Sequence, residues 1–144
     1  MAKRRDSMQV AIVGLIKRHG RLAEFEQALT RGGSFHIRLE QENYLPLVIE
    51  VIAANTISVT HYRTTNGDQV QDPEVVFEAA GGRWWPIEIT QGPVGVYRHK
   101  FLVRDGKKLV DLRFHGRTIP FVNLWAKNIR NQGWDKATAI NANA

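Results

Sequence analysis

Apolar residues near the start of the chain recur every three or four positions, and this spacing predicts a helix over residues 8–31. Gly20 interrupts the pattern, so we expect a break there. Gly32-Gly33 ends the pattern, because glycine is favoured where helices stop. The apolar stripe consists of Met8, Ile12, Leu15, Ile16, Leu22, Phe25 and Leu29. It predicts that one side of this segment packs on a core.

The middle of the chain changes to the two-residue alternation that is typical of strands. In "SFHIRLE", Phe35, Ile37 and Leu39 lie on one side and the polar residues on the other. Short turns such as Asn66-Gly67 separate the segments, and strands joined in succession by short turns form antiparallel meanders. The predicted strands are "SFHIRLE", "LPLVIEVIA", "TISVTHYR", "EVVFEA", "WWPIEIT" and "GVYRHKFLVR", with "KLVDLRF" short or irregular.

A second helical stripe lies near the end of the sequence, between Thr118, a candidate cap, and Gly133. The stripe consists of Ile119, Phe121, Leu124, Trp125 and Ile129. We therefore predict an α+β fold in which an antiparallel meander sheet of about six strands carries the N-terminal and C-terminal helices on one face. A single domain is expected over residues 1–144, with a basic tail at 1–7 and a flexible end at 135–144.

The stretch "HYRTTNGDQVQDPE" combines a histidine with several carboxylates in one predicted hairpin. A regular ladder from the turn would place His61, Asp72 and Glu74 on one face, as a candidate site for a hard divalent cation or for proton transfer. The same ladder would put Glu74 and Glu78 among apolar residues, and unpaired buried carboxylates are costly.

One inserted residue at Asp72-Pro73 removes this conflict, because proline has no N–H to give to the ladder. His61 then faces the core, while Glu74 and Glu78 lie on the outer face. The apolar alternation favours this bulge, since side-chain parity is strongly specified where one face is buried. We therefore prefer a core histidine to a metal ligand, and we predict no catalytic residue.

Trp84 and Trp85 must point to opposite faces if both lie in one strand. Trp85 is expected in the core with Ile87 and Ile89, which leaves Trp84 on the outer face of the sheet. Aromatic rings beside cations suit a nucleic-acid platform, and an exposed tryptophan also suits a protein partner. The groups expected on this face are Tyr62, Trp84, Arg98 and Lys100, together with Glu74, Glu78 and Glu88.

Charge is divided unevenly along the chain, whose formal net charge is +6. Residues 1–21 hold six basic groups and one acidic group, residues 22–97 hold four and ten, and residues 98–144 hold ten and three. The basic ends are candidates for a nucleic-acid surface, and the alternative is that they pair with the acidic middle inside the fold. The N-terminal candidates are Arg4, Arg5, Lys17 and Arg18.

Composition excludes several classes of protein. The chain has no cysteine, which rules out disulfides and thiolate metal sites and fits a reducing cytoplasm. The longest apolar run, "VAIVGLI", is much shorter than the roughly 20 residues of a membrane-spanning helix. The histidines lack zinc-ligand spacing, and no glycine-rich phosphate loop joins a strand to a helix. We therefore predict a cytoplasmic protein with no cofactor and no membrane partner.

Four stretches carry a resemblance: "LVIEVIAANTISVTHYRTTNGDQVQDPEVVFE", "WWPIEI", "GVY" and "FVNLWAKNIRNQGW". Together they resemble a family of small prokaryotic domains of unknown function that is common on plasmids, conjugative elements and phage-like regions. The likeness covers residues 34–134, whereas Trp84-Trp85 and the basic N-terminus depart from the family's pattern. The resemblance implies a compact domain from a mobile genetic element and transfers no activity.

These observations favour a small non-enzymatic binding or accessory protein of a mobile genetic element, with nucleic acid as the first candidate partner. A protein-interaction module or homodimer that uses the outer sheet face is the alternative. A divalent-metal-dependent enzyme at the 61–74 hairpin is the third hypothesis.

Overall fold

The computed structural model describes residues 7–65, 68–91, 95–98, 102–104, 107–109 and 112–140, and it describes the side chains of residues 7–62, 73–90, 116 and 118–140. Its main sheet is antiparallel, in the order β6-β5-β4-β3-β2-β1-β9. The strands are β1 (Phe35–Glu40), β2 (Leu47–Ala53), β3 (Thr56–Thr65), β4 (Asp68–Ala80), β5 (Arg83–Gln91), β6 (Gly95–Arg98) and β9 (Thr138–Ile140). A separate hairpin pairs β7 (Leu102–Arg104) with β8 (Lys107–Leu109).

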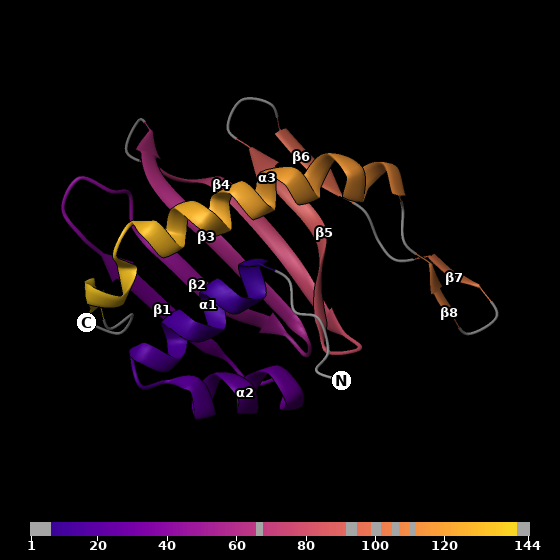
Figure 1. Ribbon diagram of the computed structural model, residues 1–144, viewed down its shortest axis with the longest axis horizontal. Helices are drawn as coiled ribbons and strands as arrows, with labels where there is room; N and C mark the ends of the chain where they lie inside the picture. Colours follow the sequence, from indigo (N-terminus) through magenta and orange to yellow (C-terminus); the bar gives the residue numbers. More distant parts are fainter. Residues whose placement is uncertain are drawn as a thin grey trace.

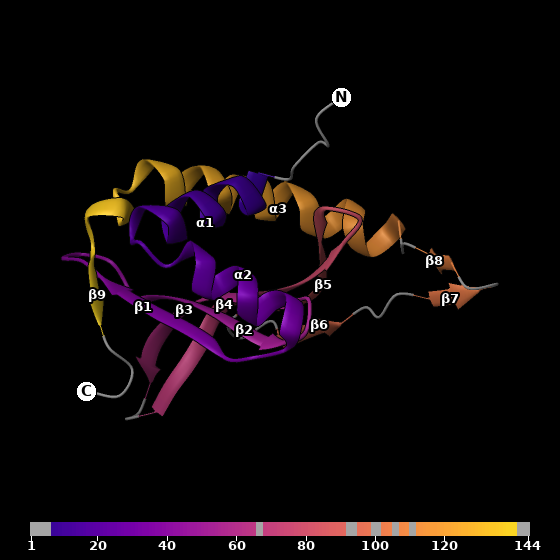
Figure 2. The same cartoon turned by 90° about the horizontal axis from the view of Figure 1, so that it is seen from below.

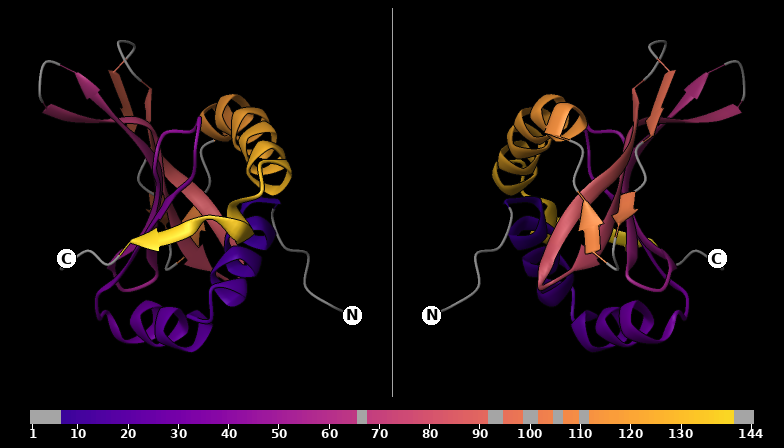
Figure 3. Two further views of the ribbon diagram at one scale, coloured as in Figure 1. Left: turned by 90° about the vertical axis from the view of Figure 1, so that its left-hand side faces the viewer. Right: turned by 90° about the vertical axis from the view of Figure 1, so that its right-hand side faces the viewer.

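The helices cover one face of this sheet, as Figures 1, 2 and 3 show from four directions. They are α1 (Ser7–Arg18), α2 (Leu22–Arg31) and α3 (Leu112–Asn131), and the 3-10 turn η2 (Trp134–Lys136) follows α3. Strands β1 to β6 pair in chain order, and β9 adds to the β1 edge. The predicted α+β fold, with a meander sheet and terminal helices on one face, is therefore confirmed.

The helices end where glycine predicts that they end. Gly20, Gly32 and Gly133 all have positive φ angles, which glycine adopts without steric cost. The N–H of Gly32 donates to the carbonyl of Ala28 at 2.9 Å and closes α2. The start of α3 differs from the prediction, because the helix already begins at Leu112 and Thr118 lies buried within it instead of capping it.

Aromatic rings fill the core between α2 and the sheet. Phe25 of α2 makes an edge-to-face contact with Phe35 of β1 and a stacked contact with Trp84 of β5, at centroid distances of 5.3 and 6.0 Å. Trp84 also contacts Phe77 at 5.7 Å. Aromatic pairs in these arrangements add to the free energy of burial, so this cluster joins the helical layer to three strands.

The hairpin of β3 and β4 contains the predicted bulge. Thr60 pairs with Glu74 and Tyr62 pairs with Gln71, so β4 holds one residue more than β3 at Asp72-Pro73. The hydroxyl of Thr60 donates to the carbonyl oxygen of Pro73 at 2.9 Å, so this carbonyl has a hydrogen-bond partner within the bulge. His61 lies on the core face of the sheet, as the bulged register predicts, because its ring contacts Trp125 of α3 and Trp134 of η2.

A second bulge, which we did not predict, lies between β4 and β5. Val76 pairs with Glu88 and Phe77 with Pro86, so Ile87 is the additional residue. The extra residue reverses the parity of β5, and Trp84 therefore faces the core with a side chain only 4% exposed. The expectation that Trp84 lies on the outer face is wrong. Pro86 supplies the physical reason, because it has no N–H for a regular ladder.

Residues 134–140 are more ordered than their composition suggests. We expected residues 135–144 to fray, whereas Thr138–Ile140 forms β9 and pairs with Arg38–Glu40 of β1. The turn before it is fixed by Trp134, which is buried and whose indole Nε1 donates to Gln132 Oε1 at 3.0 Å. Burial of this indole therefore positions the last strand.

Candidate nucleic-acid interface

Helices α1 and α3 lie side by side on the outside of the helical layer, and both run in the same direction (Figure 1). Neither helix contains an aspartate or a glutamate. Their exposed cations are Lys17, Arg18, Lys127 and Arg130, while the side chains of Arg113 and Arg117 in α3 lie outside the described residues. Cations without carboxylates between them produce a positive potential, which is the electrostatic feature that phosphate backbones require.

A groove of about 450 Å³ lies between α1, the end of α3 and η2. Its apolar lining comes from Ala11 and Leu15 of α1, Ile129 of α3, and Trp134, all of which are buried. Gly14 also lines the groove, and a Cβ atom built on it would meet nothing within 4 Å. The groove is therefore open at the one position of α1 that has no side chain.

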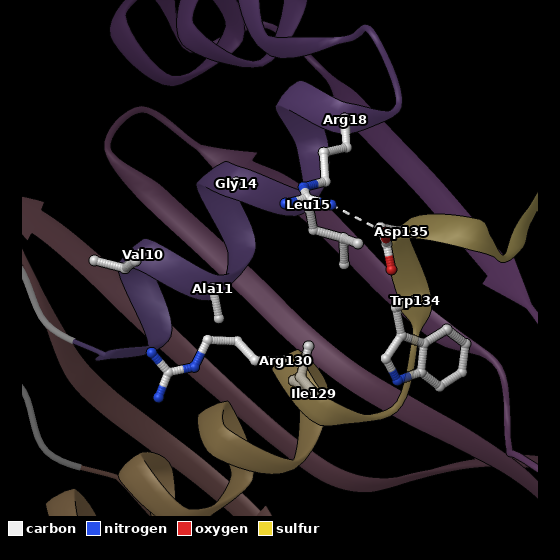
Figure 4. Close-up of a pocket in the computed structure, with 9 residues that line it drawn as sticks. All are labelled: Val10, Ala11, Gly14, Leu15, Arg18, Ile129, Arg130, Trp134 and Asp135. Atoms are coloured by element: carbon white, nitrogen blue, oxygen red, sulfur yellow. Dashed lines mark hydrogen bonds and ion pairs between the residues drawn. The ribbon is translucent and has the colours of Figure 1, made fainter.

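Two arginines stand at opposite ends of the groove (Figure 4). Arg18 Nη1 lies 3.0 Å from Asp135 Oδ2, and Arg18 remains mostly exposed in this ion pair. Arg130 has no ion-pair partner among the side chains that the structure describes. Arg130 is consequently the more available cation, while Asp135 offsets part of the charge of Arg18.

The opposite face of the sheet has the reverse charge. Among the described side chains there, five are glutamates and two are arginines, so carboxylates predominate. The glutamates are Glu40, Glu50, Glu74, Glu78 and Glu88, and the arginines are Arg38 and Arg83. The uneven charge along the sequence is therefore also a separation between two faces of the fold. The surface of α1 and α3 therefore carries positive charge and the described sheet face negative charge, while α2 adds Glu24 and Glu26 to the helical side.

Glu74 is the carboxylate of the sheet face that is most affected by its surroundings. It accepts a hydrogen bond from the Ser58 hydroxyl at 2.6 Å. Burial raises the pKa of Glu74, as do the nearby charges of Glu88 and Glu50, and the Ser58 hydrogen bond only partly opposes this rise. The raised pKa means that the charged form of Glu74 opposes folding at neutral pH.

Glu74→Gln is therefore expected to stabilise the protein at pH 7, by no more than about 1 kcal/mol because the site is partly exposed. The folded-state pKa of Glu74 lies above its unfolded value of 4.5, so its favourable contribution exists below pH 4.5 and disappears as pH rises through the folded pKa. Urea unfolding at pH 7 and pH 4 measures the effect. The gain should shrink at pH 4, and an equal gain at both values would contradict this account.

His61 and Glu74, two of the three candidate metal ligands, lie on opposite faces of the sheet. His61 Nδ1 is 3.2 Å from the carbonyl oxygens of Leu45 and Pro46, and its ring lies 5.6 and 5.8 Å from Trp125 and Trp134. The side chain of Asp72 is outside the described residues. Among the residues that the structure describes, no three His, Cys, Asp or Glu side chains form a cluster that could hold a metal ion.

Acid is expected to destabilise the fold through His61. Burial lowers the pKa of His61 from 6.5, more than the hydrogen bonds to Pro46 and Leu45 raise it. The unfolded state therefore binds the proton more readily, so this contribution to stability is complete above pH 6.5 and is lost as pH falls toward the folded pKa. Unfolding free energies of wild type and His61→Phe between pH 8 and pH 5 test this. The wild-type curve should fall more steeply below pH 6.5, and parallel curves would contradict the prediction.

The structure brings together only part of the predicted nucleic-acid set. Lys17 and Arg18 are exposed at the end of α1, whereas Trp84 is in the core. Arg4, Arg5, Lys100 and the side chain of Arg98 lie outside the described residues. Sequence reasoning included Lys127 and Arg130 only as members of the basic segment 98–144, without singling them out, and it missed Gly14. Part of the signal was present, since residues 8–21 and 118–133 hold cations and no carboxylates, but residues 22–31 add Glu24 and Glu26, and the sequence does not specify that α1 and α3 are neighbours.

Residues 12–134 match the model of a protein family described as a domain of unknown function, DUF6908. The chain belongs to this family. The match begins within α1 and ends at the first residue of η2, so it includes residues 12–18 of α1 and all of α3, as well as the strands that carry the resemblance in the sequence. Searches of curated proteins and of solved structures found no match. In the described part of the chain, no helix is both long enough and apolar enough to cross a membrane.

Proposed function

We propose that this DUF6908 protein is a non-enzymatic binding protein that engages nucleic acid through the surface of α1 and α3. The observation that carries the proposal is the absence of carboxylates from these two neighbouring helices, combined with exposed Lys17, Lys127 and Arg130. Its role as an accessory protein of a mobile genetic element belongs to the same proposal. That part is supported by the sequence resemblance alone.

The charge separation favours the helical face over the sheet face as the binding surface. Trp84, the aromatic ring that the sheet-face hypothesis used for nucleic acid and for self-association, is buried. The partly buried Trp85 lies on the sheet face instead, where its ring is already covered by the guanidinium of Arg83 at 4.6 Å. The glutamates of that face would repel phosphates. Among the described residues that line the groove between α1 and α3, Asp135 is the only carboxylate, and it is already paired with Arg18. The other described carboxylates of the helical layer, Glu24 and Glu26, belong to α2.

The test is binding of the full chain to fluorescent 20-nucleotide single-stranded and duplex DNA across a salt series. Log affinity should fall linearly with log salt, since each neutralised phosphate releases counterions. Arg130→Gln should weaken binding several-fold at low salt and make the slope shallower by about one. Unfolding curves of the variant check that the fold is intact.

Arg31→Gln is the matched control. Arg31 is exposed in the last turn of α2, as Arg130 is in the last turn of α3, and both changes remove one positive charge. The control should bind within about twofold of wild type, because α2 does not belong to the proposed surface. Equal losses of affinity in both variants would mean that the change in net charge, and not the position of Arg130, weakens binding. Absence of binding at low salt would remove the proposal.

A further inference from the structure

We propose that the groove between α1 and α3 receives a base of a single-stranded nucleic acid, whose flanking phosphates contact Arg18 and Arg130. This inference rests on the proposed function and specifies its substrate as single-stranded. The site combines an apolar lining with cations at its two ends (Figure 4). Single-strand binding surfaces combine a positively charged groove with aromatic rings on which bases stack, and here aliphatic groups take the place of the rings.

The lining of the groove suits the face of a nucleobase. The floor of the groove is formed by Ala11, Leu15 and Ile129, which are 7% exposed or less, with the indole of Trp134 buried beneath it. The exposed apolar side chain of the lining is Val10, which is 45% exposed. A base face is largely apolar, so its removal from water against these groups is favourable. The groove volume of about 450 Å³ lies in the range of small-molecule sites, which is ample for one base.

Gly14 gives the base access to the helix surface. It lies in the middle of α1, does not have a positive φ angle, and no neighbour would clash with a Cβ atom there. Neither backbone conformation nor packing therefore requires glycine, although glycine costs about 0.5–1 kcal/mol relative to alanine inside a helix. What glycine provides at this position is the close approach of a flat ligand to the backbone.

The charges of the groove match a phosphate on each side of the base. Arg130 has no described ion-pair partner, and a guanidinium is also able to stack on a base. Arg18 is held at the other end by Asp135 and keeps 69% of its side-chain surface exposed. Because Asp135 would repel a phosphate, the second phosphate contacts the exposed side of Arg18.

Double-stranded nucleic acid does not fit this site in the same way. The bases of a duplex are stacked and paired, so a surface groove has no access to their faces unless a base is flipped out. Duplex DNA would contact only the cations of the helical face. Single strands and duplexes should both bind the cations electrostatically. The groove predicts that single strands bind more tightly, because only their bases are free to enter it.

The experiment compares three labelled probes with equal backbone length: dT12, a 12-nucleotide abasic strand and a 12-base-pair duplex. Wild type should bind dT12 about tenfold more tightly than the abasic strand, which has the phosphates and lacks the bases. Gly14→Leu should fill the groove and reduce that ratio to about one, with abasic binding unchanged. Gly14→Ala should have an intermediate effect and provides a second variant.

Ala23→Leu is the control, because it adds the same side chain at an exposed position of α2. It should keep the wild-type ratio of dT12 to abasic affinity. A ratio of one in wild type, or an unchanged ratio in Gly14→Leu, would overturn the base site while leaving electrostatic binding intact. Failure of all three probes to bind at low salt would instead refute the proposed function. Binding of a labelled Glu/Leu amphipathic peptide that Gly14→Leu abolishes, without any base dependence, would also overturn the base site.

Discussion

Trp84→Ala is expected to lower the free energy of unfolding by about 3–5 kcal/mol, the usual cost of removing a fully packed aromatic side chain. Trp84 is 4% exposed and contacts Phe25 and Phe77, so its removal leaves a cavity between α2 and the sheet. For a chain of this size, the loss corresponds to a decrease in melting temperature of roughly 10 to 20 °C. Thermal and urea unfolding of the purified variant measure both quantities.

Trp85→Ala is the matched control, because the same side chain is removed one residue later. Trp85 is only partly buried, donates from Nε1 to the carbonyl of Ala80 at 3.1 Å, and lies 4.6 Å below the guanidinium of Arg83. Losing one hydrogen bond and one cation–π contact is expected to cost about 1–2 kcal/mol. A larger loss for Trp85 than for Trp84 would mean that β5 lacks the bulge at Ile87 and has the opposite parity.

The two bulges show how far the sequence alone specifies the sheet. At Asp72-Pro73, charged residues on β4 made the regular register costly, and the bulge could be predicted from that conflict. At Pro86, both the regular and the bulged register of β5 bury a tryptophan together with isoleucine, so the apolar pattern does not favour either register. The missing N–H of Pro86 was the available signal, and it has the same physical meaning as the missing N–H of Pro73.

The candidate site was predictable only in part, because it depends on which helices pack against each other. The cations Lys17 and Arg18 are visible in the sequence at the end of an amphipathic helix. Their relation to Arg130 depends on the parallel packing of α1 and α3, which periodicity does not determine. The role of Gly14 likewise depends on the empty space beside it, which appears only once the two helices are placed.

Trp134→Ala is the second change expected to have a large effect, again about 3–5 kcal/mol of unfolding free energy. Trp134 is 1% exposed, and its ring contacts Tyr44 at 5.6 Å and His61 at 5.8 Å. Its carbonyl oxygen is 3.0 Å from His19 Nε2. The side chain thus fills the region where the end of α3, the β1–β2 loop and the sheet meet, and unfolding by urea measures its contribution.

The same variant should also weaken the acid sensitivity that His61 confers. The pKa of His61 is lowered mainly by burial, and removal of the indole admits water beside the imidazole. The folded-state pKa of His61 then moves back toward 6.5, so less stability is lost as pH falls below 6.5. Trp134→Phe, which keeps an aromatic ring against His61, should retain more of both the stability and the pH dependence. A Trp134→Ala protein with lower stability but the full wild-type pH dependence would show that other groups, and not this indole, keep water from His61.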